Sequence, residues 1–453
     1  MAVDRSKLPA LGPEPAFTFP EIRRRVLGNG LRVWTVEHRD VPVLNVVLLL
    51  PVGAADDPAD LPGLAAITGD LLDEGSGTLG ALQFHEALGR LGASLDTEVG
   101  SDATLLGITL LERFAERGLE LLADLVTRPR LDVHELERVR ELRINRLTQL
   151  RDVPSAVAER VFVQRLYGDH PYGHLSIGTE AALAALNIDD VVRFHETRYD
   201  PGFATLIVVG DATHDRLAEL ADMAFGRWEP AAHRRRAERS AESPPAPDDR
   251  LVLIHRPGAA QSELRIGHVS VPRSTPDYHA LLTLNMILGG QFVSRINMNL
   301  REKKGYTYGA RTSFDLRRGA GPFVLQASVQ SEATTDAVRE AIGELRAIRD
   351  DRPVTHDELL LGRAALTRGY PRNFETAEQI ARAAAQLALY ELPDDYFSRF
   401  VQTVLALTPE EVTQAAVTHI HPGELLTVIV GDRDTVGPSL ETLGRVTDSS
   451  GLA

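Results

Sequence analysis

Few residues in this 453-residue chain have the types and spacing that chemistry requires, and it contains no cysteine. The segment HPYGH sets His170 and His174 at the i, i+4 spacing with which two imidazoles hold zinc on a helix. Pro171 and Gly173 oppose a helix at this place, so we expect no metal site there. The segments FHEAL, VHELE and FHETR contain His-Glu without a second histidine at helical distance. The residues alone therefore give no complete catalytic set.

A second candidate is an arginine and a tyrosine seven positions apart in LREKKGYTY. We expect a helix from about Phe292 to Lys304, whose cationic end suits the helix dipole. A strand is expected to follow, which would place Arg301 in the last helical turn and Tyr308 on the strand. A guanidinium and a phenol so placed could hold a substrate carbonyl or a developing oxyanion. Spacing alone equally allows ordinary structural roles at a helix end and in a strand.

The segment LPGLAAITGDLLDEGSGT, residues 61–78, predicts a helix without obvious chemistry. Apolar Leu64, Ile67 and Leu71 recur at helical spacing, and the glycines that follow should end the helix. Residues 75–80, GSGTLG, fit the pattern G-x-G-x-x-G, but a dinucleotide site needs a strand before those glycines. We therefore expect no nucleotide site here.

The elements that position these candidates come in two similar sets. Residues 186–211 can be laid on residues 407–432 without a gap. Each copy predicts an amphipathic helix, a Pro-Gly turn and an apolar strand that ends in Val-Gly-Asp. In each half, strands also precede the helices, so the repeat extends beyond these two segments to the order of elements in both halves.

The repeat predicts an α+β fold of two similar domains, each a mainly antiparallel sheet backed by helices. We place the domains at residues 17–230 and 248–440. The linker between them, residues 231–247, is rich in proline, alanine and charge and has no periodicity.

Composition excludes several classes of function. A formal net charge of −15 argues against nucleic acid as a partner, because phosphate binding needs clustered Lys and Arg. No apolar stretch is long enough for a membrane span, and no secretory signal is visible at the start of the sequence. These features favour the cytoplasm, while the periplasm stays open if a signal peptide has been removed.

Several motifs together resemble the pitrilysin or insulinase family of zinc peptidases, in its short two-domain form. They are GNGLRVW, PGLAA…LLDEGSGT, YGDHPYG, SRINMNLREKKGYTYG and the two Gly-Asp strands. Catalytic members carry H-x-x-E-H on the first-domain helix and a glutamate ligand on a later helix. The two histidines hold zinc, and the glutamate between them activates the bound water.

The resemblance places the metal and base positions on residues that cannot fill those roles. The histidines of H-x-x-E-H fall on Ala66 and Asp70, the general-base glutamate on Gly69, and the later glutamate near Arg146. It therefore implies that this chain binds no zinc. By contrast, Arg301 and Tyr308 match a family pair that reaches the substrate bound at the other domain's zinc.

Loss of the zinc residues with retention of the pair resembles the non-catalytic subunit of a heterodimeric metalloendopeptidase. The resemblance implies a homologous partner with H-x-x-E-H and its zinc, and a peptide or unfolded polypeptide as substrate. Arg301 and Tyr308 would then bind the substrate and act catalytically at the partner's zinc site. One alternative is a non-enzymatic scaffold or peptide-binding protein of the same fold. Another is a homodimer with an unrelated activity, for which the sequence offers no residues.

Overall fold

The computed structural model describes residues 17–231 and 244–449 of the chain. Its strands form two sheets of six and one small pair, β4–β5. The first large sheet contains β1 (Arg23–Val26), β2 (Arg32–Glu37), β3 (Val43–Leu50), β6 (Ser94–Val99), β7 (Thr104–Leu111) and β8 (Thr205–Gly210). The second contains β9 (Leu251–His255), β10 (Gln261–Val269), β11 (Ala310–Phe314), β12 (Pro322–Gln330), β13 (Leu426–Gly431) and β14 (Thr447–Asp448). The small pair joins β4 (Gly75–Ser76) to β5 (Leu79–Gly80).

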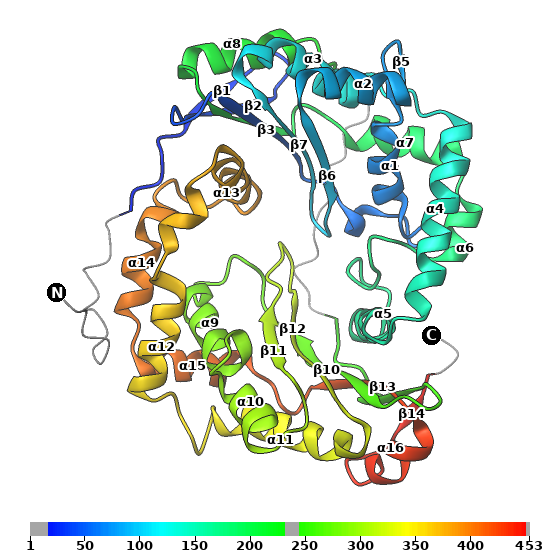
Figure 1. Cartoon of the computed structure of the whole chain (residues 1–453), viewed down its shortest axis with the longest axis vertical. Coiled ribbons are helices and arrows are strands. Elements are labelled where there is room, and N and C mark those ends of the chain that lie inside the picture. The colour runs from blue at the N-terminus through cyan, green and yellow to red at the C-terminus, as the bar shows by residue number, and fades with distance from the viewer. Residues whose placement is uncertain (1–16, 232–243, 450–453) are drawn as a thin grey trace, which may run out of the picture.

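Helices surround both sheets (Figure 1). Those of the first half are α1 (Leu64–Leu72), α2 (Ala81–Leu91), α3 (Ala115–Thr127), α4 (Val133–Arg151), α5 (Pro154–Tyr167), α6 (Glu180–Ala185), α7 (Ile188–Arg198) and α8 (His214–Phe225). Those of the second half are α9 (Tyr278–Asn285), α10 (Arg295–Asn297), α11 (Thr334–Ala347), α12 (His356–Thr367), α13 (Ala377–Leu389), α14 (Tyr396–Ala406), α15 (Pro409–His419) and α16 (Arg433–Leu440). Short helical turns are η1 (Ala54–Asp56), η2 (Glu112–Phe114), η3 (Met286–Gly290), η4 (Met298–Lys303), η5 (Ser331–Ala333) and η6 (Tyr370–Phe374).

The two sheets share one topology, which confirms the predicted α+β fold with an internal repeat. The first has the order β1-β2-β8-β3-β7-β6 and the second, read from its other edge, β14-β9-β13-β10-β12-β11. In both, the Gly-Asp strand pairs in parallel with the first strand of the repeat and antiparallel with the second. Only the outermost strands differ, because β1 pairs antiparallel with β2 whereas β14 pairs in parallel with β9.

The domain boundaries remain predictions. Most of the predicted linker, residues 232–243, lies outside the described residues. Strand β14 lies beyond residue 440, at which we ended the second domain, and it completes the second sheet. The last strand therefore belongs with the second half of the fold.

Each half lends one helix to the sheet of the other half. Helix α13 of the second half packs on β3 and β8 of the first sheet, and α5 of the first half packs on β10 and β13 of the second. Six alanines of α13 are buried in the cluster with Trp34 and Ile207. Small side chains allow a helix backbone to approach a sheet closely, so the alanine-rich face of α13 suits this position. The exchange joins the two halves through two separate apolar cores.

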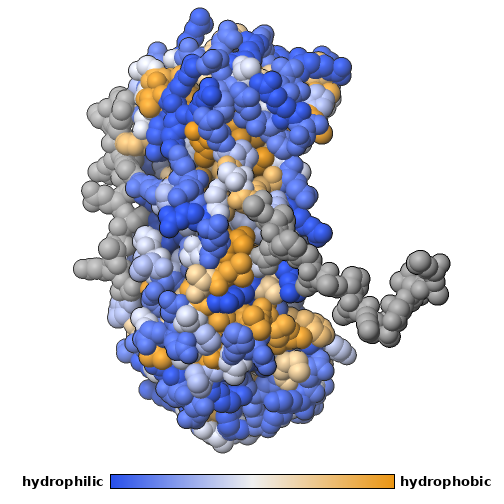
Figure 2. Space-filling view, turned by 90° about the vertical axis from the view of Figure 1, so that its left-hand side faces the viewer, coloured by the Kyte–Doolittle hydropathy of each residue, from blue (hydrophilic) through white to orange (hydrophobic). Residues whose placement is uncertain are grey.

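The surface is mostly polar around these cores. Figure 2 shows a largely hydrophilic face, with hydrophobic residues gathered in its middle and lower part. Among the described helices, none combines the length and apolar character needed to cross a membrane. Apolar side chains are common at protein surfaces, so the presence of this hydrophobic surface alone does not identify a partner.

A buried histidine makes the second sheet sensitive to acid. His268 on β10 is 2% exposed. Its Nδ1 lies 2.8 Å from the Val269 carbonyl, and its Nε2 accepts a hydrogen bond from the His421 amide at 3.2 Å. Burial lowers the pKa of His268 from 6.5 to about 4, with the charges of His421 and His419 contributing in the same direction. The folded state therefore keeps this ring neutral.

We predict that the free energy of unfolding falls as the pH drops from about 6.5 towards 4, because the unfolded chain then binds the proton more tightly. For this one ring the expected loss between pH 7.5 and pH 5 is about 2 kcal/mol. Urea unfolding at the two pH values measures it. His268→Gln should reduce the measured difference by about this amount, whereas His356→Gln, at an exposed position, should leave it unchanged. Equal pH dependence in all three proteins would contradict this assignment.

Candidate functional site

Helix α1 occupies the place where sequence predicted a helix, but it is shorter than expected and ends at Leu72. Its start is fixed by Asp57, which accepts hydrogen bonds from the amides of Gly63 at 2.6 Å and Ala65 at 2.7 Å. Burial raises the pKa of Asp57, and His174 Nε2 lies 3.0 Å from its carboxylate. One histidine of the HPYGH segment therefore supports the start of α1 through Asp57.

The residues that the resemblance sets against H-x-x-E-H take part in packing and in an ion pair. Ala66 is 3% exposed and belongs to the buried face of α1. A Cβ atom at Gly69 would lie 2.8 Å from Val99 Cγ2 on β6, so the edge strand covers this position. Asp70 accepts a hydrogen bond from Arg143 Nε on α4 at 2.6 Å. None of these three side chains offers an imidazole, and the one carboxylate is paired with a cation.

A cavity of about 640 Å³ lies beside this part of α1. Its wall includes Asp70, Asp73 and Glu74 as well as Arg143 and Arg146. Burial raises the pKa of Asp73, and the neighbouring charge of Glu74 raises it further. The acidic groups therefore repel one another, while two guanidinium groups balance their charge.

These residues do not fit a zinc site. Zinc in family-type sites is held by neutral imidazole and carboxylate ligands with an open position. In the described part of the chain, no three His, Asp or Glu side chains converge in a way that could hold a metal ion. Arg146, at the later ligand position, brings a positive charge instead. We therefore derive no zinc chemistry from this chain's own residues.

Arg301 and Tyr308 lie in a segment whose structure differs from the prediction. Helical backbone starts at Arg295 and not at Phe292, and it is α-helical only to Asn297 before the wider turns of η4. Strand β11 starts at Ala310, so Tyr308 lies in the loop before the strand and not on it. Its side chain is 94% exposed. The tyrosine is therefore free to meet another molecule.

Arg301 is held by its own segment. Its guanidinium donates to the Phe292 carbonyl at 3.0 Å and to Glu302 at 2.9 Å, and its centre lies 3.4 Å from the centroid of the Phe292 ring. The Arg301 side chain is 13% exposed, whereas Phe292 as a residue is 70% exposed. Within the described residues, no hydrogen bond joins Arg301 to Tyr308. The structure thus orients the arginine and leaves the tyrosine hydroxyl available.

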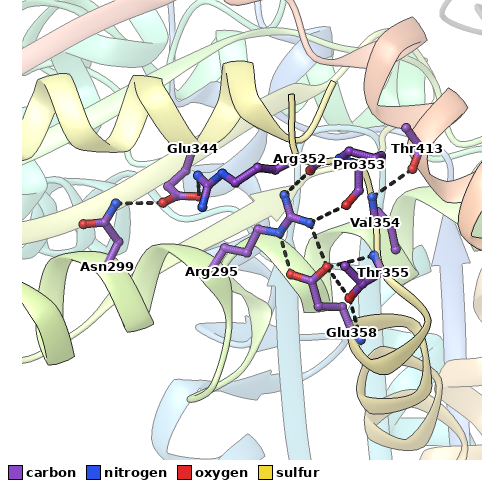
Figure 3. Close-up of polar contacts among 9 residues, drawn as sticks. All are labelled: Arg295, Asn299, Glu344, Arg352, Pro353, Val354, Thr355, Glu358 and Thr413. Carbon is purple, nitrogen blue, oxygen red and sulfur yellow. Dashed lines mark hydrogen bonds and ion pairs between the residues drawn. The ribbon is translucent and has the colours of Figure 1, made fainter. Parts of the chain in front are cut away.

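A partly buried ion pair anchors the start of this segment (Figure 3). Arg295 donates two hydrogen bonds to Glu358 on α12, at 2.6 and 2.7 Å, and two more to the carbonyls of Arg352 and Pro353. Burial of Glu358 opposes its ionisation, but Arg295 and the Thr355 amide lower its pKa overall. Four of the five N–H donors of the guanidinium are therefore engaged, which fixes the direction of α10.

Two asparagines extend the anchor to the neighbouring elements. Asn299 donates to Glu344 on α11 at 2.7 Å, as Figure 3 also shows. Asn297 accepts a hydrogen bond from the Ala310 amide at 2.8 Å, which ties the helix to the first residue of β11. The loop that carries Tyr308 is thereby fixed at both ends. Sequence analysis missed these residues, although the asparagines in SRINMN were the one local sign of them.

The repeated halves and the altered helix define a two-lobed, peptidase-like chain. Residues 32–180 match the family model described as Insulinase (Peptidase family M16), and residues 185–366 match the one described as Peptidase M16 inactive domain. The chain belongs to the peptidase M16 family, which confirms the resemblance seen in the sequence.

Relatives and solved structures agree with this assignment. An uncharacterized zinc protease of Mycobacterium leprae is 26% identical over 350 residues, which cover 76% of this chain and 77% of that protein. An uncharacterized zinc protease of Bacillus subtilis is 21% identical over 328 residues, which cover 72% of this chain and 78% of that protein. A peptidase M16 inactive domain from Pseudomonas fluorescens superimposes with a TM-score of 0.84 at 24% identity, covering 91% and 98%. A protease from Helicobacter pylori gives 0.83 at 21%, covering 91% and 99%. Structures at this identity support the fold.

We predict that Arg295→Met lowers the free energy of unfolding by roughly 2 kcal/mol, because the half-buried Glu358 then loses its cation and two charged hydrogen bonds. Chemical denaturation measures the change. Arg339→Met is the matched control, since it breaks an exposed ion pair with Asp336 and should cost less than about 1 kcal/mol. Similar losses in the two variants would show that the Arg295 pair is not a special anchor.

We also predict that restoring the ligands will not by itself restore a metal site. The combination Ala66→His, Gly69→Glu, Asp70→His and Arg146→Glu should bind zinc poorly, because Val99 occupies the space beside residue 69. Adding Val99→Ala should improve zinc affinity, whereas adding Val41→Ala at an exposed position should not. Zinc titration with a competing chelator compares the three proteins. Tight binding of one zinc by the first combination alone would contradict the steric argument.

Proposed function

We propose that this chain is the non-catalytic subunit of a heterodimeric zinc metalloendopeptidase. The observation that carries the proposal is the contrast between its two halves. In the first, all four positions of the zinc and base set hold residues unsuited to the task, and strand β6 closes over one of them. In the second, Arg301 is oriented and Tyr308 is exposed on a segment anchored by buried polar contacts.

In this proposal the partner supplies H-x-x-E-H and its zinc, and this chain supplies contacts to the substrate. A carbonyl oxygen of the bound peptide accepts hydrogen bonds from the Arg301 guanidinium and the Tyr308 hydroxyl. Negative charge that develops on that oxygen during cleavage strengthens both bonds, so they favour the transition state over the ground state. To reach the substrate, the Arg301 guanidinium must first break its hydrogen bond to the Phe292 carbonyl.

Peptide recognition would rest largely on backbone contacts. Strand β6 is an edge of the first sheet and pairs only with β7 in the described structure. An extended peptide can add to such an edge through main-chain hydrogen bonds, with alternate side chains facing the protein. This mode suits a peptide or unfolded polypeptide substrate and requires no particular sequence.

A peptide-binding scaffold of the same fold is the second candidate. The match of residues 185–366 to the inactive-domain model and the close approach of Val99 to Gly69 fit it equally well. The exposed Tyr308 beside an oriented Arg301 favours the enzymatic pairing, because a scaffold has no need of that pair. Activity of the mixed subunits separates the two candidates.

We predict that Arg301→Ala and Tyr308→Phe each reduce turnover by the assembled pair roughly 100-fold or more, as loss of an oxyanion contact does. The assay mixes each variant with an H-x-x-E-H protein encoded beside this chain and follows cleavage of a quenched fluorescent peptide. Assembly, measured by analytical ultracentrifugation, should be unchanged.

Arg311→Ala is the matched control, because Arg311 is an exposed cation on the adjoining strand that pairs only with Gln326. It should leave turnover near the wild-type rate. Wild-type turnover by both site variants would refute their role in catalysis. A stable mixed complex that cleaves no peptide would favour the scaffold.

A further inference from the structure

A second cavity, of about 620 Å³, lies where the two halves meet. The turn between β6 and β7 forms one side, and α9, α13 and the turn after β11 form the other. Figure 1 shows these elements around the middle of the molecule. Five leucines supply most of the apolar wall: Leu49, Leu105, Leu282, Leu316 and Leu389. A cavity of this size and lining is typical of sites for small ligands.

One cation in this wall differs from the others. Arg273 is 6% exposed, and its guanidinium lies over the ring of Tyr278, 3.4 Å from the centroid. It donates one hydrogen bond, to the Tyr396 hydroxyl at 2.7 Å, and a third ring, that of Tyr390, lies 5.6 Å away. Among the described residues, no carboxylate forms an ion pair with it. The tyrosine faces stabilise the buried charge without neutralising it.

The remaining charged groups in the wall are already engaged. Arg382 pairs with Asp96, Glu98 and Glu378, Arg317 pairs with Asp315, and Asp102 accepts from the Tyr172 hydroxyl and the Arg318 amide. Arg273 is therefore the one cation of this wall for which the described residues supply no ion-pair partner. Its effect reaches His279, whose pKa is lowered to about 4 by burial and then by this charge.

We propose that this cavity binds a carboxylate attached to an apolar body, with the carboxylate at Arg273 and the body against the leucines. A guanidinium matches the planar, two-oxygen geometry of a carboxylate. A more highly charged anion fits less well, because Glu98, Asp102 and Asp315 also line the cavity. This inference does not depend on the proposed zinc partnership.

The Tyr390 hydroxyl gives the carboxylate a second donor. Tyr390 lines the same cavity, and burial followed by the charges of Asp102 and Asp315 raises its pKa to about 12. The phenol therefore stays protonated and can donate a hydrogen bond at neutral pH. The same chemistry is carried by the C-terminus of a peptide and by a free aliphatic acid, so the test must distinguish these sources.

Calorimetric titration of the full chain tests the proposal with three probes: Ala-Ala-Leu with a free C-terminus, the same tripeptide as its C-terminal amide, and hexanoate. We expect at least one carboxylate to bind and the amide to bind about tenfold more weakly or not at all. Tighter binding of the tripeptide would identify peptide C-termini as the ligand, and tighter binding of hexanoate would identify free acids. Equal binding of amide and acid, or no binding of either carboxylate at millimolar concentration, would overturn the proposal.

Variants locate the binding in this cavity. Arg273→Gln should weaken carboxylate binding about tenfold or more, because the charge is lost. Leu389→Trp narrows the cavity without altering Arg273, and it should also weaken carboxylate binding. It provides the test if the Arg273→Gln protein fails to fold. Arg372→Gln, at an exposed arginine outside the wall, is the control and should bind as the wild type does. Undiminished binding by a folded Arg273→Gln or Leu389→Trp protein would place the site elsewhere.

Discussion

The reciprocal exchange of α5 and α13 is the constraint on which the rest of the structure depends. Each sheet has one face covered by helices of its own half and the other covered by a helix from the opposite half. Neither half can bury both faces of its sheet alone, so the free energy of burial couples their positions. The exchange brings the β6–β7 turn, α13 and the turn after β11 together around the interdomain cavity. The packing of α5 and α13 on the opposite sheets therefore determines how the two halves are placed relative to each other.

Helix α1 is held in place by contacts that involve no metal ligand. The features that place α1, namely Asp57 at its start and an apolar buried face, are independent of metal ligands. At Gly69 the neighbouring strand comes close, because Val99 Cγ2 would lie 2.8 Å from a Cβ atom there. Arg143 pairs with the carboxylate of Asp70. The apolar face of α1 is part of the first core, so packing alone is enough to hold the helix in place.

Sequence predicted the architecture better than the contacts. Alternating and helical patterns, with the repeated Gly-Asp strands, were enough for the two similar α+β halves, because these signals are local. The exchange of α5 and α13 could not be predicted from the sequence, because the apolar periodicity of a helix does not specify which sheet the helix covers. The Arg295–Glu358 pair joins residues far apart in the chain, and the covering of Gly69 by Val99 depends on tertiary packing. The helix before Arg301 started three residues later than predicted, where the Asn297 contacts to Gln291 and Ser294 close a turn.

The central claim is that this chain contributes to peptide cleavage without a metal site of its own. The most direct test is zinc content and peptidase activity after equilibration with zinc and removal of the excess, for the chain alone and mixed with an H-x-x-E-H partner. The account predicts far less than one equivalent of zinc and no cleavage for the chain alone, with zinc and cleavage together in the mixture. One equivalent of zinc and chelator-sensitive cleavage by the chain alone would contradict it.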